Sequence, residues 1–426
     1  MLQLNYIRDH KDEIIERLAV RNFDGKQLVE EIIKTDEVRR ESQTQGDSLQ
    51  AEMNKLSKQI GECFKSGKKD EAEELKQKTA DLKERIKGLN TSKAEAEEDL
   101  RNLLLSLPNV PHPSVPPGKS DEDNEVLKEY GEAPKLHEGA APHWDLTKKY
   151  KLIDFERGVK VTSAGFPVYT GKGAKLQRAL ITFFLNEADK AGYREIMPPL
   201  LVNEETGIAT GQLPDKEGQM YHIPEEDLYL IPTAEVPITN IYRGEIIKKE
   251  EFPIKMCGYT PCFRREAGSY GKDVRGLNRL HQFDKVEIVQ IVHPDESYKV
   301  LDEMVEYVKS LLDKLGLHYR ILRLCGGDLG FTSALTYDFE VYSAAQDRWL
   351  EVSSVSNFES FQANRLQCRF KDENNKTRLA HTLNGSALAF PRLLAALIEN
   401  NQTHDGIEIP PALAIYTGFD QITQNS

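Results

Sequence analysis

Two charged residues in CFRREAG (262–268) are of the types that bind small anionic ligands. Arg264 and Glu266 stand two positions apart, so they share one face if this segment is a strand. A guanidinium matches a phosphate or carboxylate with its planar fork, and a nearby glutamate can fix that fork or accept a hydrogen bond from a base or an amine. The alternative is a surface ion pair, which explains most such pairs.

Two further clusters contain the side chains expected for a small polar ligand and a cation. In IPTAEV (231–236), Thr233 and Glu235 also share a strand face and are suited to holding an ammonium group, with polar decoration of an edge strand as the alternative. In LEVSS (350–354), Glu351 lies among small and hydroxyl residues and is suited to a hard cation such as Mg²⁺.

The segment HTLNGSALAFPR (381–392) ends in an arginine where a strand is expected to give way to a helix. Such a transition directs Arg392 toward an anion, and Gly385 permits close approach of the backbone. The chain contains neither G-x-x-x-x-G-K-[ST] nor G-x-G-x-x-G, so a P-loop or Rossmann site is excluded as the nucleotide binder.

The overall composition indicates a soluble cytoplasmic protein. The 69 acidic and 56 basic residues give a formal net charge of −13, which argues against indiscriminate binding to nucleic acid or anionic membranes. The N-terminus has no apolar core of a signal peptide, and no apolar run approaches the ~20 residues that span a bilayer. The five cysteines include no C-x-x-C pair, so structural thiols are expected rather than disulfides or zinc ligands.

Residues 27–107 predict a long helical hairpin. They lack proline, and GECFKSGKKD (61–70) provides glycines that can turn the chain between two helices of similar length. Apolar positions alternate by four and three residues, the pattern of a coiled-coil seam. In the second helix the stripe comprises Leu75, Thr79, Leu82, Ile86, Leu89, Lys93, Ala96, Leu100, Leu103 and Leu107.

The outer part of this hairpin is basic although the protein is acidic. From Lys55 to Lys93 there are 11 basic and 7 acidic residues, a local net charge of +4. Such a surface attracts a phosphate backbone. A solvated helix pair of mixed charge remains the alternative reading of charge alone.

The rest of the chain indicates an α+β domain with an antiparallel sheet flanked by helices. Five prolines in PNVPHPSVPP (108–117) predict an extended segment, so we expect an N-terminal domain at 1–107, a linker at 108–130 and a catalytic domain at 131–426. The expected helices are 174–191, 294–315 and 387–400. The expected strands are 228–231, 259–265, 282–292, 337–342 and 348–352, the last two paired around SAAQD (343–347).

Four of these motifs, in this order, resemble the class II aminoacyl-tRNA synthetases. They are LYLIPTAEVPITN (228–240), FRREAGSYGKDVRGLNRLHQFDKVE (263–287), LEVSSVSNF (350–358) and HTLNGSALAFPR (381–392). Together with the hairpin they resemble the seryl-tRNA synthetase family of bacterial type over essentially the whole chain. The resemblance implies the class II catalytic fold, and an ATP-dependent activation of L-serine followed by transfer of the seryl group to the 3′ end of tRNA(Ser).

The resemblance assigns a serine site residue by residue. The ammonium group would lie among Thr233, Glu235 and Glu287, and the hydroxyl near Asn384 and Ser386. The complete set of implied serine-binding residues is Thr233, Ala234, Glu235, Arg264, Glu287, Asn384 and Ser386.

The resemblance also implies an ATP site with Mg²⁺ held by Glu351 and Ser354. Strict alternation groups Glu351 with Ser353 instead, so this assignment needs a bulge or a strand end between them. Within the site, Arg264 would bridge the serine carboxylate and the α-phosphate, Glu266 would contact the adenine amino group, and Phe283 would stack on the base beside the Leu280 backbone, while Arg392 would hold the γ-phosphate. The implied ATP-binding residues are Arg264, Arg265, Glu266, Leu280, Phe283, Glu351, Val352, Ser353, Ser354 and Arg392.

The family's partners are a tRNA and a second copy of the chain. The hairpin would grip the long variable arm of tRNA(Ser), and the first motif, residues 176–198, would form a homodimer interface. The charging of a selenocysteine tRNA, tRNA(Sec), stays open. The expected tRNA contacts are Lys55, Lys58, Lys65, Lys68, Lys69, Lys76, Lys272 and Arg275.

The chain departs from the family pattern in its third motif. Glycine is usual where Ala387 stands, and smaller residues are usual at Phe390–Pro391; because Gly385 and Arg392 remain, we expect activity. Three alternatives are a class II synthetase of another specificity, a ligase that loads a carrier protein, and an inactive tRNA-binding relative. The hairpin argues against the carrier-protein ligase. Four retained charged residues argue against the inactive relative: Arg264, Glu266, Glu351 and Arg392.

Overall fold

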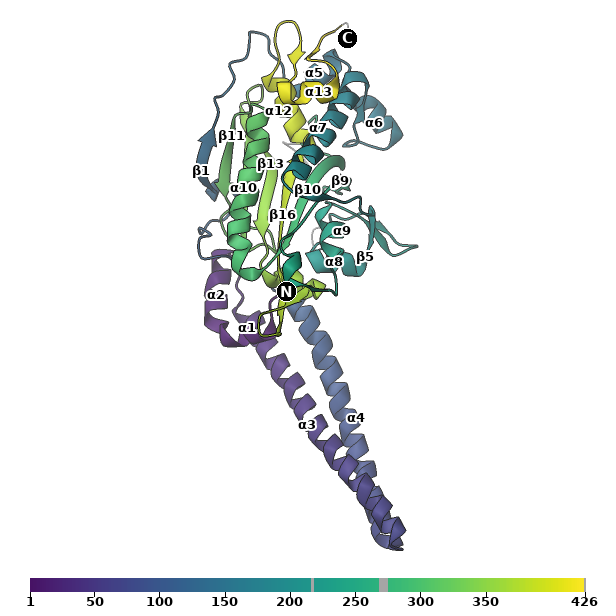
Figure 1. The fold of residues 1–426 in the computed structure, drawn as a ribbon. Helices are drawn as coiled ribbons and strands as arrows, with labels where there is room; N and C mark the ends of the chain where they lie inside the picture. Colours follow the sequence, from purple (N-terminus) through teal and green to yellow (C-terminus); the bar gives the residue numbers. More distant parts are fainter. Residues whose placement is uncertain (216–217, 268–274, 425–426) are drawn as a thin grey trace. The chain divides into compact units, whose positions relative to one another are not determined.

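The computed structural model describes residues 1–215, 218–267 and 275–424, and the chain forms two compact units. The first consists of Met1–Ala19 with Phe23–Pro108, and the second of Val20–Asn22 with the remainder of the chain from Asn109 (Figure 1). None of the described helices is both long and apolar enough to cross a lipid bilayer.

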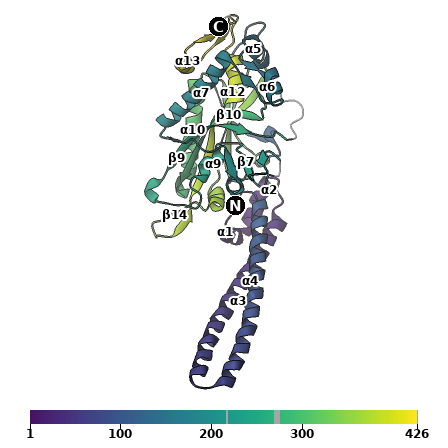
Figure 2. The same cartoon turned by 90° about the vertical axis from the view of Figure 1, so that its right-hand side faces the viewer.

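The first unit is helical and contains the predicted hairpin. Two short helices, α1 (Leu4–Asp9) and α2 (Lys11–Val20), precede the long pair α3 (Lys26–Lys65) and α4 (Lys69–Ser106). Figure 2 shows α3 and α4 running back along one another. The turn is shorter than the predicted 61–70, because α3 continues through Gly61 and only Ser66–Lys68 lie between the helices.

The seam between α3 and α4 follows the predicted spacing of four and three. Leu82, Ile86, Ala96 and Leu100 of α4 are buried, as the stripe requires. In α3, Ile32 is fully buried. Apolar burial at the turns of each helix that face the partner therefore holds the hairpin together, which confirms the coiled-coil prediction.

The second unit is built on an eight-stranded sheet. The strand order is β1-β11-β12-β13-β16-β10-β9-β4, and every neighbouring pair is antiparallel except β4 with β9. This confirms the predicted α+β architecture. The strands are β1 (Glu125–Tyr130), β4 (Arg194–Glu195), β9 (Ile254–Phe263), β10 (Gln282–Val292), β11 (Tyr319–Arg323), β12 (Leu335–Ser343), β13 (Arg348–Asn357) and β16 (His381–Ala389).

Two stretches differ from their predicted structure. Glu125–Tyr130, expected within the linker, forms β1 and pairs with β11 at the edge of the sheet. Residues 387–389, expected to begin a helix, extend β16, where Ala389 pairs with Lys285 of β10. Helix α12 (Phe390–Asn400) begins after them, and Pro391 fits its first turn because an N–H there has no partner within the helix.

Three helices pack on one face of the sheet. These are α7 (Gly171–Lys190), α10 (Ser297–Lys314) and α12, of which the first two confirm the predicted helices at 174–191 and 294–315. Their apolar side chains share one buried core with sheet residues, for example Phe184 and Met304 with Ile288 and Phe339. This face is closed, so polar side chains that alternate with the core residues lie on the opposite face.

The remaining elements are short. The helices are α5 (His143–Lys149), α6 (Phe155–Val161), α8 (Glu204–Thr210), α9 (Glu235–Asn240), α11 (Ser360–Leu366) and α13 (Pro411–Thr417). The strands of the small sheets are β2 (Ile153–Asp154), β3 (Val168–Tyr169), β5 (Leu201–Asn203), β6 (His222–Ile223), β7 (Leu228–Leu230), β8 (Ile246–Ile247), β14 (Arg369–Lys371), β15 (Thr377–Leu379), β17 (Ile407–Glu408) and β18 (Gln421–Ile422). Single 3₁₀ turns are η1 (Asp121–Asp123), η2 (Lys249–Glu251) and η3 (Pro294–Glu296).

Candidate active site

Strands β10 and β16 bring the predicted serine ligands onto the open face of the sheet. In their antiparallel register Glu287 lies opposite Ser386, and Val289 lies opposite Asn384. Because directly opposed residues point to the same face, Glu287, Asn384 and Ser386 are neighbours on one surface. All three are buried, and the Thr233 hydroxyl donates to Glu287 Oε2 at 3.0 Å.

Glu235 reaches the same pocket from a helix rather than from a strand. It begins α9, and its backbone N–H donates to Thr233 Oγ1 at 3.2 Å, so the expectation that Thr233 and Glu235 share a strand face is wrong. Strand β7 ends at Leu230, and the chain turns into α9 before strand alternation reaches these residues. Ala234 between them is fully buried.

The sequence reasoning missed a second layer of residues behind Glu235. Gln362 of α11 donates from Nε2 to Glu235 Oε1 at 2.7 Å, and the Thr382 hydroxyl donates to Gln362 Oε1 at 2.8 Å. Both side chains are buried. No local sequence signal pairs residues 127 positions apart, although Thr382 shares its strand face with Asn384 and Ser386.

The electrostatic environment raises the pKa of Glu235 to about 7. Burial is the main cause, because it penalises the charged carboxylate, and the neighbouring Glu287 adds to it. The Gln362 hydrogen bond and the Lys285 charge act in the opposite direction. A positive charge beside Glu235 would therefore stabilise its ionised carboxylate.

Lys285 is a further pocket residue that the sequence reasoning missed. It is buried and forms an ion pair with Glu287, two positions along β10. Period-two alternation along the predicted strand 282–292 contained this signal, since it places Lys285 and Glu287 on one face.

Arg264 lies at the end of β9, next to Phe283 of β10. Its guanidinium carbon is 5.2 Å from the centroid of the Phe283 ring, and its Nε donates to the carbonyl oxygen of Pro232 at 3.4 Å. The guanidinium thus borders the segment that contains Thr233, and an arginine in this position can bind a carboxylate and a phosphate together.

The expectation that Arg264 and Glu266 share a strand face is wrong. Strand β9 ends at Phe263, and Glu266 has a φ of 49°, in the left-handed region. Glu266 forms an ion pair with Arg279 at 2.7 Å. Arg265 is exposed, and its backbone N–H donates to the Gln219 carbonyl at 2.8 Å, whereas Leu280 is buried.

A bulge in β13 brings Glu351 and Ser354 to the same side of the strand. Ser353 pairs with Phe339 of β12, but the next pair is Glu351 with Glu340, so Val352 is the extra residue. Glu351 is exposed and Ser354 half-buried. Val352 is buried in the core, and the Ser353 hydroxyl donates to the Ser386 carbonyl at 2.5 Å. The bulge that the metal assignment required is thus present.

Arg392 projects from the first turn of α12 toward this end of β13. Its Nε donates to the Asn278 carbonyl at 3.0 Å, and its Nη1 lies 3.6 Å from Glu351 Oε2. Phe390, one of the departures from the family pattern, is buried against Phe184, with ring centroids 5.6 Å apart. The change from strand to helix before Arg392 confirms the local prediction.

The predicted tRNA contacts are distributed over both units. The six hairpin lysines are exposed and lie toward the turn between α3 and α4. Arg275 is exposed, and its guanidinium lies over the Trp144 ring at 4.5 Å. Lys272 is outside the described residues.

The cysteines and the acidic side chains offer no separate metal site in the described part of the chain. All five cysteines are free thiols. Within residues 1–215, 218–267 and 275–424, no three His, Cys, Asp or Glu side chains gather in a way that could hold a metal ion.

Two protein families match the chain. Residues 1–111 match the seryl-tRNA synthetase N-terminal domain, and residues 220–401 match the tRNA synthetase class II core domain (G, H, P, S and T). A serine–tRNA ligase from Salinibacter ruber is 54% identical over 424 residues, which cover 99% of each chain.

Solved structures agree with these matches. Seryl-tRNA synthetase from Pyrococcus horikoshii, complexed with ATP, is 33% identical with a TM-score of 0.94, over 99% of each chain. M. kandleri SerRS, in complex with A. aeolicus tRNASec, is 19% identical with a TM-score of 0.57, over 78% of this chain and 68% of that chain, a likeness of fold alone. From the full-length identity and the two matched domains, the chain belongs to the seryl-tRNA synthetase family.

Proposed function

We propose that Thr233, Glu235, Glu287, Asn384 and Ser386 form the serine pocket of this enzyme. The observation that supports it most is the buried carboxylate pair Glu235–Glu287, with one nearby lysine. The ammonium group of a bound amino acid would supply a second positive charge and two or three hydrogen-bond donors. A pocket of this charge and size fits a small zwitterion whose carboxylate faces Arg264.

The reaction is the activation of serine and the charging of tRNA with it. In the first step a serine carboxylate oxygen attacks the α-phosphorus of ATP, and the bond to the bridging oxygen breaks as pyrophosphate leaves. In the second step a ribose hydroxyl at the 3′ end of tRNA attacks the carbonyl carbon, and AMP leaves. The first step moves no proton, so catalysis depends on positioning and on charge stabilisation. We assign both to Arg264, between the pocket and the nucleotide.

The nucleotide would extend from Arg264 along the strand ends to Arg392. Phe283 offers its ring to the adenine, Glu266 its carboxylate to the adenine amino group, and Arg392 its guanidinium to the γ-phosphate. A solved relative is complexed with ATP, which supports ATP as the nucleotide of this site.

The bulged end of β13 fits a magnesium ion. Glu351 and Ser354 lie on one side of the strand, and Asp338, paired with Ser354, has a buried Oδ1 without a hydrogen-bond partner among the described atoms. Oxygen ligands of this kind suit Mg²⁺, which takes its remaining ligands from phosphates and water. When bound, the ion would neutralise phosphate charge, and Glu351 would exchange its contact with Arg392 for it.

The pocket also accounts for selection by the serine hydroxyl. Asn384 and Ser386 are buried polar groups, and alanine offers them no hydroxyl for a hydrogen bond, so its affinity should be lower than that of serine by ~10²-fold or more. Threonine has the hydroxyl and one more methyl group, so the shape of the pocket would have to exclude it.

The hairpin is assigned to tRNA binding. The local charge of +4 between Lys55 and Lys93 and the exposure of its lysines support contacts to phosphates. One structural relative was solved with a tRNA(Sec), so both tRNA(Ser) and tRNA(Sec) are candidates. Replacing Lys55, Lys58, Lys65 and Lys69 by glutamine should reduce tRNA charging and leave ATP–pyrophosphate exchange unchanged.

A homodimer is assigned to the first motif. After α7, the side chain of Met197 is 90% exposed, and Leu200 and Leu201 are also exposed. Apolar side chains gathered in this way commonly cover an interface. Sedimentation at micromolar concentration should give the mass of two chains, and Met197→Lys should shift it toward one.

ATP–pyrophosphate exchange with each of the twenty amino acids, without tRNA, tests the proposed pocket. Exchange with serine alone is expected. Exchange driven by another amino acid would support the alternative of a different specificity, and no exchange would support the inactive relative. The curated relatives named serine–tRNA ligase favour the first result.

A further inference from the structure

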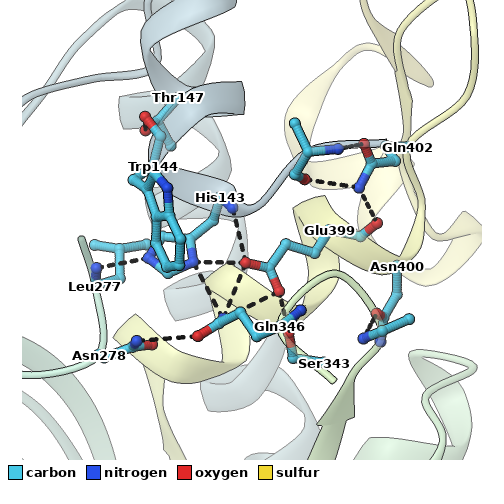
Figure 3. Close-up of polar contacts among 12 residues, drawn as sticks. His143, Trp144, Thr147, Leu277, Asn278, Ser343, Gln346, Glu399, Asn400 and Gln402 are labelled. Atoms are coloured by element: carbon cyan, nitrogen blue, oxygen red, sulfur yellow. Dashed lines mark hydrogen bonds and ion pairs between the residues drawn. The ribbon is translucent and has the colours of Figure 1, made fainter. Parts of the chain in front are cut away.

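A closed ring of polar contacts surrounds the buried side chains of His143 and Glu399 (Figure 3). The Glu399 carboxylate accepts from His143 Nδ1 at 2.6 Å, and His143 Nε2 accepts from the Leu277 backbone N–H at 2.8 Å. Asn278 Nδ2 donates to Gln346 Oε1 at 3.0 Å, and Gln346 Nε2 donates back to Glu399 Oε1 at 3.0 Å. The His143 and Glu399 side chains are fully buried.

The partners of His143 determine its tautomer. A backbone N–H can only donate, so Nε2 must carry a lone pair, and the ring proton is on Nδ1, which donates to Glu399. Glu399 also accepts from the His143 backbone N–H at 2.7 Å and from the Ser343 hydroxyl. Its carboxylate thus has a donor on every side and holds the imidazole in one orientation.

The ring joins elements that are remote in the sequence. His143 begins α5, and Leu277 and Asn278 lie in the segment before β10. Ser343 ends β12, Gln346 lies between β12 and β13, and Glu399 lies near the end of α12. Two of the proposed ATP ligands lie in these elements, Leu280 in the segment before β10 and Arg392 in α12. The Asn278 carbonyl accepts a hydrogen bond from Arg392 Nε. The ring is thus connected to the side chain proposed to hold the γ-phosphate.

We infer that His143 is a positioning residue for ATP. Held by Glu399, it fixes the backbone at Leu277 and Asn278, and the Asn278 carbonyl in turn fixes the Arg392 guanidinium for the γ-phosphate. This rests on the proposed role of Arg392. The serine pocket is independent of the ring, because its hydrogen bonds run through Gln362 and Thr382 instead.

The close approach at Gly276 supports this role. Gly276 has a φ of +66°, and a Cβ there would lie 2.2 Å from His143 Nε2. The chain therefore passes directly over the imidazole, where only glycine fits. Arg275 stacks on Trp144, the neighbour of His143, so α5 also contacts the segment on this side.

Two substitutions of His143 each keep the hydrogen bond of one imidazole nitrogen and remove that of the other. In His143→Asn the amide nitrogen replaces Nδ1, so the bond to Glu399 stays and the bond to Leu277 is lost. In His143→Gln the amide oxygen replaces Nε2, so the bond to Leu277 stays. ATP–pyrophosphate exchange on the full chain should show the KM for ATP raised about 10-fold in His143→Asn and largely restored in His143→Gln.

A change in the KM for ATP without a change in the KM for serine would distinguish a positioning role from a general loss of structure. The KM for serine should stay within about twofold in both variants, because the pocket shares no partner with the ring. A matched control is His318→Asn. His318 is another buried histidine, and its Nδ1 bonds to the Tyr130 carbonyl at the sheet edge. It should change neither KM.

Three outcomes would overturn the inference. They are equal rises in both KM values for His143→Asn, no rise in the KM for ATP in a folded His143→Asn protein, and no rescue by glutamine. Arg392→Ala distinguishes a failure of the proposed function: if it leaves the KM for ATP unchanged, the assignment of the γ-phosphate is wrong, whatever His143 does.

Discussion

The proposed serine pocket and the proposed ATP side of the site are built in opposite ways. In the pocket, Glu235 is 6% and Glu287 is 2% exposed, and both are held by direct hydrogen bonds or ion pairs inside the pocket. On the ATP side, the side chains of Glu351 and Arg392 are 49% and 30% exposed. The positions of these two side chains depend on how β13, α12 and the segment before β10 pack together.

This difference follows from what each substrate requires. Serine is small, and only buried polar groups that would otherwise lack partners can distinguish its hydroxyl from the missing group of alanine. ATP is large and highly charged, so strong ligands in water suffice, provided that they stand at the correct separation. On this proposal, specificity resides in the pocket, and alignment of ATP resides in the contacts that join β13, α12 and the segment before β10.

Arg264 lies between the two regions, so its loss should have the largest effect. In Arg264→Ala, kcat for exchange should fall about 10³-fold, because a preorganised charge at the reacting phosphate is removed. Steady-state exchange measures this. Arg157→Ala is the matched control, since Arg157 is an exposed arginine of α6 that forms an ion pair with Asp154. A loss below tenfold for Arg264→Ala would place the bridging charge elsewhere.

Glu235→Gln should affect the pocket without affecting the ATP side. Glutamine keeps the shape but not the charge that holds the ammonium group, so the KM for serine should rise about 10²-fold. The KM for ATP should stay within about twofold. Exchange measured as a function of each substrate gives both values, and a parallel rise in the KM for ATP would show that the two regions are not separate.

The pH dependence should sharpen the same contrast. Because the pKa of Glu235 is raised to about 7, the free enzyme is protonated there below pH 7 and cannot hold the ammonium group. The value of kcat/KM for serine should therefore fall, up to about tenfold per pH unit, as the pH drops below 7, and Glu235→Gln should lose this dependence. A profile that is flat from pH 8 to 6 would contradict the raised pKa.

The same shift has a consequence for stability. The folded protein binds this proton more tightly than the unfolded chain does, since the pKa rises from 4.5 to about 7. The contribution of Glu235 to stability is therefore fully present below pH 4.5 and is lost as the pH rises toward 7. Thermal unfolding of the wild type and of Glu235→Gln over this range measures it.

The smallest effect should come from the layer behind the pocket. Gln362→Leu removes one hydrogen bond to Glu235 but keeps the carboxyl group in the pocket, so the KM for serine should rise only about fivefold to tenfold. Exchange at varied serine concentration measures the change. Gln367→Leu is a suitable control, because Gln367 is exposed and bonds to the Asn364 carbonyl near its own backbone. Equal effects of the two substitutions would remove Gln362 from the account.

Short-range patterns predicted much of this architecture. The pattern at 282–292 predicted β10, and strict alternation along 350–354 required the bulge that the structure has at Val352. The heptad spacing predicted the buried side chains of α4. These features depend on residues a few positions apart, whose geometry the backbone period determines.

Other features depend on contacts that no local pattern encodes. Glu266 adopts a positive φ because β9 ends before it, and Glu235 begins a helix because the chain turns after β7. His143 and Glu399 are 256 positions apart, and only the packing of α5 against α12 brings them together. Tertiary context decides such residues, so sequence reasoning that starts from periodicity cannot reach them.

The proposed arrangement is a buried serine pocket and a separately positioned ATP side that meet at Arg264. ATP–pyrophosphate exchange over a grid of serine and ATP concentrations, with Glu235→Gln and His143→Asn compared with the wild type, tests it most directly. Glu235→Gln should raise only the KM for serine, and His143→Asn should raise only the KM for ATP. If either substitution raises both KM values to the same extent, the two regions act as one site and the account is wrong.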